Sequence, residues 1–374
     1  MYEQIDAYVD RLIRESTPER TIWNVERLRQ GKSADWNYID GCMMTALLSM
    51  EEITGEAKYF DFVEGFVGHF VREDGSILTY DQSKYNLDDV NEGRVLFSLY
   101  SRTGKEKYRK AADLLREQLR NQPRTTEGNF WHKAIYPNQV WLDGLYMAQV
   151  FYALYEKYFG SGDFSDTVRQ IETVHKRMFV PETGLYCHGY DESRSIFWAD
   201  PETGRSKGFW LRSLGWFAVA LADLCEILPP AEESIRRIFR ELMENVARYA
   251  DAESGLYWQV VDQGGRAGNY LETSGSSMLA YAMLKGARLG VLGQEYAAKG
   301  EKTFHGIVER YLSFRDETLN LGGICLVAGL GPADNPRRDG TFEYYISEPV
   351  VENDAKGVAP FLLCYTEIKR RTCS

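Results

Sequence analysis

The sequence lacks an excess of basic residues, because 44 Lys and Arg stand against 55 Asp and Glu and give a formal net charge of −11. No run rich in Lys or Arg interrupts this acidic background. Proteins that bind phosphate backbones or anionic lipid without sequence preference depend on clustered positive charge. We therefore expect neither nucleic acid nor a membrane surface as a partner.

Long apolar segments and closely paired cysteines are missing too. No segment approaches the roughly 18 apolar residues of a membrane span. The first 16 residues carry acidic and basic side chains throughout, so we expect no secretory signal there. The cysteines contain no C-x-x-C pair and are scattered over a chain long enough to fold without disulfides; they are Cys42, Cys187, Cys225, Cys325, Cys364 and Cys373. These features predict a cytoplasmic protein with buried, unreactive thiols.

Nucleotide and metal motifs are also absent. Gly31-Lys32-Ser33 lacks the first glycine of a phosphate-binding loop, because position 26 is Glu. The five histidines include no H-E-x-x-H motif and no i, i+4 pair. We therefore expect no cofactor and no metal, which leaves carboxylate chemistry.

What the chain does contain is a recurring pair of helical patterns. Six segments are apolar around most of their circumference, as expected of helices buried on several sides; they span 39–53, 89–102, 143–158, 211–228, 272–289 and 354–370. Six amphipathic segments accompany them, at 3–15, 57–72, 105–120, 164–179, 232–250 and 294–313. The repeat predicts six inner helices matched by six outer ones.

The connections between these helices are of two kinds. Links from an inner to an outer helix are tight and carry glycine near the helix end, as at Gly55 and Gly104, where a C-cap favours left-handed geometry. Links from an outer to an inner helix are long, and those at 128–131, 184–186 and 255–258 carry a Gly-aromatic strand pattern. The sequence thus predicts an all-α protein, a single (α/α)6 barrel over residues 1–374 with short strands in the loops at its cleft end. An open helical solenoid is the alternative.

Two aspartates stand at the predicted cleft end. Asp88 precedes the second inner helix and Asp143 opens the third, so both carboxylates should meet in the cleft. Helix capping is the competing interpretation: Asp89 and Glu92 have the spacing of a capping box, and Asp143 has the place of an N-cap. If Asp89 is the cap, Asp88 is free to point into the cleft.

Other polar and aromatic residues gather at the same end. Arg212 lies between Trp210 and Trp216, a combination that suits an acidic sugar, because a guanidinium binds a carboxylate and indoles cover the faces of the ring. The alternative is that both tryptophans are core residues and Arg212 pairs with a structural acid. The 18 Phe, 8 Trp and 24 Tyr exceed what packing requires and favour a wet, ring-binding cleft.

An ordered set of motifs along nearly the whole chain resembles the unsaturated rhamnogalacturonyl hydrolases, glycoside hydrolase family 105, which are related to the unsaturated glucuronyl hydrolases. The motifs are Trp36-Asn-Tyr38-Ile-Asp-Gly41, Leu87-Asp88-Asp89-Val-Asn91-Glu-Gly93, His132-Lys133, Gln139-Val-Trp141-Leu-Asp143, His188-Gly189-Tyr190-Asp191, Trp210-Leu-Arg212 with Gly215-Trp216, Tyr270 to Met278, and Glu343 to Pro349. Val150, Ser213-Leu214 and Cys187 depart from the family pattern, and none of them replaces a carboxylate.

The resemblance implies a metal-free barrel that acts on a small unsaturated oligosaccharide left by a polysaccharide lyase, in the degradation of pectin. It implies that Asp143 donates a proton to C4 of the unsaturated uronic acid and then activates water, and that Asp88 orients the water or shares the proton. The substrate-binding residues that it implies, together with those argued above, are Tyr38, His132, Lys133, Trp141, His188, Trp210, Arg212 and Trp216. Since the acid must be protonated, we expect burial and a neighbouring carboxylate to raise the pKa of Asp143.

Two other functions compete with this one. A conventional inverting glycosidase on the same barrel would use one acid and one base, with carboxyl groups about 6.5–9.5 Å apart. A non-enzymatic helical scaffold or sugar-binding module would present the aromatic cleft without turnover. The residues leave the second sugar and the oligomeric state open.

Overall fold

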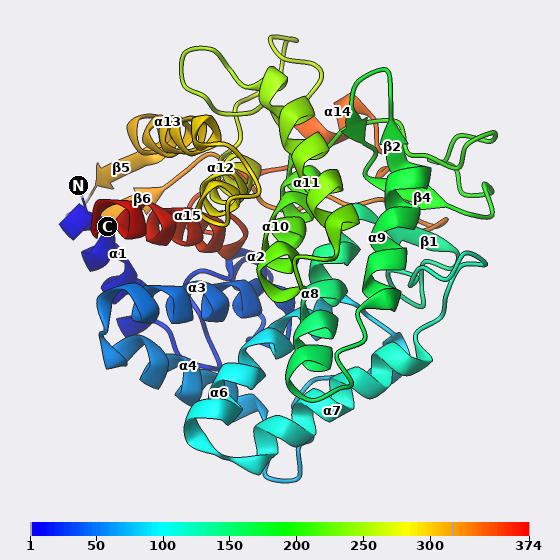
Figure 1. Cartoon of the computed structure of the whole chain (residues 1–374). Helices are drawn as coiled ribbons and strands as arrows, with labels where there is room; N and C mark the ends of the chain where they lie inside the picture. Colours follow the sequence, from blue (N-terminus) through cyan, green and yellow to red (C-terminus); the bar gives the residue numbers. More distant parts are fainter. Residues whose placement is uncertain (1, 316–317, 374) are drawn as a thin grey trace.

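The computed structural model describes residues 2–315 and 318–373. Six inner helical segments form a closed ring, in which each packs against the next and the last returns to the first (Figure 1). They are α3 (Tyr38–Thr54), α5 (Asp88–Asn91) continued by η2 (Glu92–Val95) and α6 (Leu96–Thr103), α8 (Leu142–Tyr158), α10 (Leu211–Ile227), α12 (Thr273–Arg288) and α15 (Ala355–Cys373). The predicted (α/α)6 barrel is confirmed.

The outer layer consists of amphipathic helices whose apolar faces cover the ring. They are α1 (Tyr2–Arg14), α4 (Ala57–Phe70), α7 (Glu106–Asn121), α9 (Ser165–Met178), α11 (Glu233–Val246) and α13 (Gln294–Tyr311). Beneath this outer layer, the inner helices α8 and α10 are buried along nearly their whole length. This double burial explains why the inner segments are apolar all round while the outer ones are not.

The first and last helices of the described chain pair with each other, the outer helix α1 with the inner helix α15. The Tyr365 hydroxyl on α15 donates a hydrogen bond to Asp6 on α1 at 2.9 Å, and Lys369 forms an ion pair with the same carboxylate at 3.0 Å. Figure 1 shows the two ends of the chain side by side. The expected sixth pair is therefore made from the two ends of the barrel sequence.

The second inner helix differs from the expectation of one helix over 89–102. It is interrupted by the 3₁₀ turn η2, which contains Gly93. A Cβ on Gly93 would lie 2.4 Å from Leu115 and 2.9 Å from Phe151, so α7 and α8 approach the backbone closely there. We attribute the tighter turn to this packing, which periodicity alone does not reveal.

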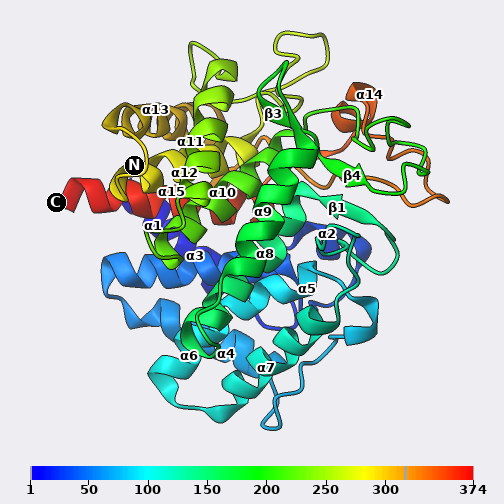
Figure 2. The same cartoon turned by 45° about the vertical axis from the view of Figure 1, so that its right-hand side comes forward.

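The two ends of the barrel differ as predicted. At one end, Gly55 and Gly104 cap α3 and α6 with φ of 72° and 68°. The other end carries the long loops, the remaining short helices and the antiparallel strand pairs (Figure 2). These elements are α2 (Val25–Gln30), η1 (Gln82–Lys84), η3 (Ala247–Tyr249), α14 (Phe342–Ile346), β1 (Gln139–Trp141) with β4 (Gly189–Asp191), β2 (Phe179–Val180) with β3 (Leu185–Tyr186), β5 (Leu312–Arg315) with β6 (Thr318–Leu321), and β7 (Ile324–Cys325) with β8 (Val350–Val351).

The strand expectations are met in part. The pattern at 184–186 corresponds to β3, whereas the patterns at 128–131 and 255–258 give only isolated bridges, at Phe130 and Trp258. In the described part of the chain, no helix has the length and apolar character needed to cross a membrane. Five cysteines are buried free thiols, and the side chain of Cys373 lies outside the described residues.

Candidate active site

A cavity of about 380 Å³ opens at the long-loop end of the barrel. Its wall combines acidic, basic and aromatic side chains from five parts of the sequence. The lining residues are Glu26, Arg27, Gln30, Asp35, Asn37, Tyr38, Ile39, Asn86, Asp88, Asp89, His132, Lys133, Tyr136, Trp141, Asp143, Met147, Trp210, Arg212, Trp216, Val327, Ala328, Gly329 and Arg338. Nine of the ten residues predicted from the sequence as catalytic or substrate-binding are among them.

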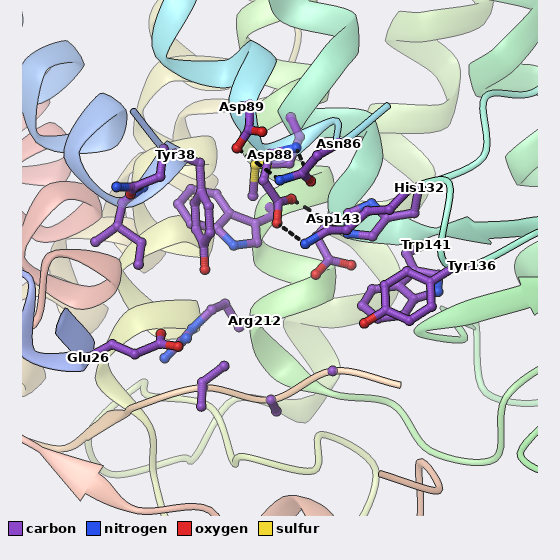
Figure 3. A pocket seen from close by; sticks show the side chains of 18 of the residues that line it. Glu26, Tyr38, Asn86, Asp88, Asp89, His132, Tyr136, Trp141, Asp143 and Arg212 are labelled. Atoms are coloured by element: carbon purple, nitrogen blue, oxygen red, sulfur yellow. Dashed lines mark hydrogen bonds and ion pairs between the residues drawn. The ribbon is translucent and has the colours of Figure 1, made fainter. Parts of the chain in front are cut away.

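Asp88 and Asp143 reach this cavity from the first turns of the neighbouring helices α5 and α8. Figure 3 shows both carboxylates pointing toward the same space. Neither helix begins with a side-chain cap hydrogen bond, so the N-cap interpretation of Asp143 is wrong. The structure therefore brings together the two carboxylates that the sequence singled out.

The capping-box interpretation of Asp89 is also wrong. The Asp89 carboxylate accepts a hydrogen bond from the Asn86 side chain at 2.9 Å, and the Glu92 carboxylate accepts one from the backbone N–H of Asn37 at 2.9 Å. Asn86 makes the local turn itself, since its side-chain oxygen Oδ1 accepts a hydrogen bond from the Asp88 N–H at 3.1 Å. With the turn made by Asn86, Asp89 lines the cavity beside Asp88.

Asp88 is held by two basic side chains from the loop before β1. Lys133 donates a hydrogen bond to Asp88 at 2.6 Å, and Nε2 of His132 lies 3.5 Å from the other carboxylate oxygen. Burial lowers the pKa of Lys133, but Asp88 outweighs burial and raises it above its ordinary value. Burial lowers the pKa of His132 to about 4. Asp88 is thus fixed in place by a lysine ammonium and a buried imidazole.

Asp143 has a different environment. Nε2 of His188 lies 3.4 Å from Asp143 Oδ1, and neither atom has a hydrogen-bond partner within the described ranges. Burial raises the pKa of Asp143, but the imidazoles of His188 and His132 outweigh burial and hold it below its ordinary value. The predicted upward shift is therefore wrong for the free protein, because imidazoles rather than a carboxylate are the nearest titratable neighbours.

The carboxyl with the raised pKa is instead Asp89. Burial and the negative charge of Asp88 raise its pKa to about 7. From the sequence, Asp89 is expected only as a helix cap. The available signal in the sequence was the pair of adjacent aspartates before a buried helix, because the charge of one disfavours ionisation of the other.

Aromatic rings make up the rest of the wall. His132 and Tyr136 stack on Trp141 with ring centroids 4.5 and 4.6 Å away. Trp216 stacks on Tyr146 at 4.3 Å, with an angle of 16° between the rings. The cavity is therefore lined by flat apolar surfaces beside charged groups, which suits the ring of a charged sugar.

Residues 8–372 match the sequence family described as Glycosyl Hydrolase Family 88. The chain belongs to this family. The solved structure of a family 105 glycoside hydrolase from C. acetobutylicum ATCC 824 is 40% identical, with a TM-score of 0.90, and the match covers 98% of this chain and 99% of that one. The resemblance inferred from the motifs is confirmed.

Two curated relatives extend this likeness. Protein Atu3128 of Agrobacterium fabrum is 45% identical over 191 residues, which are 49% of this chain and 82% of the relative. Unsaturated rhamnogalacturonyl hydrolase YesR of Bacillus subtilis is 26% identical over 264 residues, which are 68% of this chain and 72% of YesR. The family 88 chain is a glycoside hydrolase of the unsaturated glycuronyl hydrolase type.

Arg212 of this family 88 chain lines the cavity but is only 1% exposed. Its guanidinium donates hydrogen bonds to the Ser274 hydroxyl at 2.8 Å and to the Cys325 carbonyl, and it lies 3.7 Å from Glu272. The alternative in which Arg212 pairs with a structural acid therefore holds for the side of the guanidinium that faces Glu272. Because Arg212 also lines the cavity, binding of a substrate carboxylate on the cavity side is a proposal.

His188 lies outside the cavity wall, because its side chain is fully buried behind Asp143. Direct substrate contact does not fit this position, and the prediction for His188 is corrected accordingly. Two segments that sequence reasoning missed complete the wall: α2 with the residues before α3, and the loop that carries Gly329 and Arg338. The Asn24 cap and the left-handed Gly31 at the ends of α2 were the available signals for the first. Nothing in the sequence places the second at the cavity.

In the described ranges 2–315 and 318–373, no group of three or more His, Cys, Asp or Glu side chains is arranged to hold a metal ion.

Proposed function

We propose that this family 88 chain, as one catalytic domain spanning residues 1–374, releases 4,5-unsaturated galacturonic acid from unsaturated rhamnogalacturonan disaccharides. The reaction is hydration of the enol-ether double bond. The observation that carries the proposal is that Asp88 and Asp143 face one aromatic-walled cavity from neighbouring helices. The similarity to YesR, an unsaturated rhamnogalacturonyl hydrolase, supports the choice of substrate.

In this reaction the carboxyl of Asp143 gives its proton to C4, and the electron pair of the C4–C5 double bond forms the new C–H bond. The oxygen of a water molecule bonds to C5, and the water's proton returns to Asp143. The hemiketal at C5 then opens, and the hemiacetal left at C1 releases the saturated sugar. Asp88, held by Lys133 at 2.6 Å, orients the water.

The low pKa of Asp143 in the free protein is compatible with this order of events. A bound unsaturated uronide displaces water from the cavity and brings its own carboxylate close to Asp143. Both effects disfavour the charged form of Asp143 and raise its pKa. Asp143 therefore takes up the catalytic proton as the substrate binds, in a site where His188 holds the carboxyl in position.

The decisive experiment follows the ultraviolet absorbance of the double bond with unsaturated galacturonyl and glucuronyl disaccharides. Hydration removes the absorbance, and we expect faster loss with the galacturonyl substrate. In heavy water the product should carry deuterium at C4, and in oxygen-18 water the label should enter at C5. Oxygen label at C1 without deuterium at C4 would identify a conventional inverting glycosidase, and binding without turnover would identify a sugar-binding protein.

Arg212 is proposed as the receptor for the substrate's carboxylate. Replacing it with Leu should weaken binding of the unsaturated uronide by roughly a hundredfold, and binding of the carboxyl-reduced analogue much less. Thermal unfolding checks that the loss of the Glu272 pair has not unfolded the variant. Arg338→Leu is the matched variant, because Arg338 lines the cavity and its guanidinium forms no ion pair with the described residues. If only Arg338→Leu separates the two ligands, Arg338 is the receptor.

We also propose that the protein works in the cytoplasm on fragments of pectin. Five buried free cysteines support a reducing compartment. Cell fractionation with an antibody against the protein tests the compartment directly, and recovery outside the cytoplasm would refute it.

A further inference from the structure

The fully buried His188 stands between Asp143 and a second group that the reaction above does not use. Nδ1 of His188 lies 2.8 Å from the hydroxyl of Tyr345 on α14, and Nε2 lies 3.4 Å from Asp143 Oδ1 on α8. The three side chains come from three separate segments, and His188 and Tyr345 are both 0% exposed. Tyr345, His188 and Asp143 thus lie in a row that leads from the protein interior to the proposed catalytic carboxyl.

The backbone holds His188 in this place. In the β1–β4 pair, Trp141 lies opposite Gly189, and the N–H of Leu142 donates to the His188 carbonyl at 2.9 Å. The strand pairing thus joins the start of α8 to the segment that carries His188. The ladder therefore fixes the backbone from which the imidazole reaches Asp143.

Tyr345 is held as firmly from its own side. Its ring stacks on Trp210 with 6° between the planes, and its backbone carbonyl accepts a hydrogen bond from Gln259 at 3.1 Å. A Cβ on Gly208 would lie 2.9 Å from the Tyr345 ring, so the glycine leaves the space that the ring fills. The hydroxyl therefore has a fixed direction toward His188.

We propose that Tyr345 is a positioning residue that acts through His188 to fix the tautomer of the imidazole and thereby the hydrogen bonding of Asp143. The inference rests on the proposed role of Asp143 as the proton donor. Burial keeps the pKa of Tyr345 well above its ordinary value, so its hydroxyl keeps its proton. The Tyr345 O–H donates to Nδ1, which places the ring proton on Nε2, facing the carboxylate.

This arrangement gives Asp143 a donor whenever it is charged. Nε2–H stabilises the carboxylate after the proton has gone to C4, and the contact at 3.4 Å can shorten when substrate fills the cavity. The other titratable groups around this row are His132 beside Asp143, Asp88 and Lys133 beyond His132, and Tyr344, Cys187 and Asp339 around Tyr345. None of these other groups is hydrogen-bonded to the His188 ring in the described structure.

The test is Tyr345→Phe, which removes the hydroxyl and keeps the ring that stacks on Trp210. We expect kcat to fall about tenfold with little change in KM, because a buried hydrogen bond to the imidazole is lost. The limb of the pH profile that reports Asp143 should move by up to about one pH unit toward higher pH, since the carboxylate loses its fixed donor. The nitrogen-15 chemical shifts of His188 should change from the Nε2–H pattern to a mixture of tautomers.

The matched control is Tyr186→Phe, because the Tyr186 hydroxyl lies 2.7 Å from Nδ1 of His175, away from the cavity. It should alter the His175 signals and leave the kinetics and the His188 signals unchanged. Unchanged His188 shifts and an unchanged pH profile in Tyr345→Phe would overturn the proposal. The nitrogen-15 measurement needs no turnover, so it separates a failure of this inference from a failure of the proposed reaction.

Discussion

A tyrosine, a histidine and a carboxylate meet twice in this molecule, once at the mouth of the barrel and once on its flank. At the mouth, Tyr345 contacts His188 at 2.8 Å, and His188 lies 3.4 Å from Asp143. On the flank, Tyr186 of β3 contacts His175 of α9 at 2.7 Å, and His175 lies 3.8 Å from Glu241 of α11. We call these the mouth triad and the flank triad.

Both triads contain a tyrosine, a histidine and a carboxylate, and they differ most in their surroundings. The His188 side chain is 0% exposed and that of Asp143 12%, whereas the values for His175 and Glu241 are 22% and 34%. Asp143 borders the cavity, and Glu241 does not. Water competes for the flank carboxylate and screens its charge, so the histidine there has little control over it. Acid–base catalysis therefore requires a carboxylate that is shielded from bulk water and borders a cavity. The presence of a tyrosine, a histidine and a carboxylate is not enough by itself.

The largest expected effect separates the two carboxylates. Asp143→Asn should lower turnover by about 10²–10⁴-fold while substrate binding and the fold persist, because the amide keeps the shape and cannot donate the proton. Glu241→Gln, the matched change in the flank triad, should leave turnover unchanged and alter the free energy of unfolding by less than about 0.5 kcal/mol. The absorbance assay and urea unfolding measure both. If Asp143→Asn retained more than about a tenth of the wild-type rate, Asp143 would not be the proton donor, and the proposed catalytic difference between the two triads would be wrong.

A second prediction concerns pH and the groups beside the mouth triad. Burial lowers the pKa of His132 to about 4, so folding disfavours its proton, and stability is lost as pH falls from about 6.5 to about 4. Burial and Asp88 raise the pKa of Asp89 to about 7, so stability is lost as pH rises from about 4 to about 7. The effect is worth about 3 kcal/mol for His132 and about 4 kcal/mol for Asp89, so the two largely offset each other in the wild type.

Single substitutions should expose the two opposing slopes. Between pH 4 and pH 7, the free energy of unfolding should rise with pH in Asp89→Asn and fall with pH in His132→Gln, relative to the wild type. On the flank, burial lowers the pKa of His175 as well, but its partial exposure makes the effect of His175→Gln smaller. Urea unfolding at several pH values measures all three, and parallel curves for the mouth variants would contradict the prediction.

The smallest expected effect is on stability, where the triads should be alike. Tyr345→Phe and Tyr186→Phe each remove one buried hydrogen bond to a histidine, so each should lower the free energy of unfolding by about 1 kcal/mol. Thermal or urea unfolding of the two variants side by side checks this. A much larger loss in Tyr345→Phe would mean that the mouth triad is chiefly a structural support.

Much of the fold was predictable because apolar periodicity reports which faces are buried. The third inner helix was expected at 143–158 and is found at Leu142–Tyr158. The break around Gly93 was not predictable, since it arises from contacts with α7 and α8 that lie far away in the sequence. Local pattern therefore predicts the helices, and packing between distant segments decides where one of them is interrupted.

The candidate site followed the same division. Asp88 and Asp143 were predictable because each stands at the start of an inner helix on the long-loop side. The position of His188 and the direction of the Asp143 pKa shift were not, because both depend on which side chains surround a buried group. Tyr345 lies 157 residues from His188 in the sequence, and no motif signals a pairing over that separation.

The closure of the ring by α15 also determines when the barrel becomes whole during synthesis. Because α15, of 19 residues, lies between α12 and α3, the ribosome must deliver the last helix before either neighbour is covered. Until then the nascent chain is an open arc with apolar edges at both ends, which is the kind of intermediate that chaperones bind. The cavity wall, from α2 to the loop that carries Gly329 and Arg338, is therefore synthesised before α15 closes the ring around it.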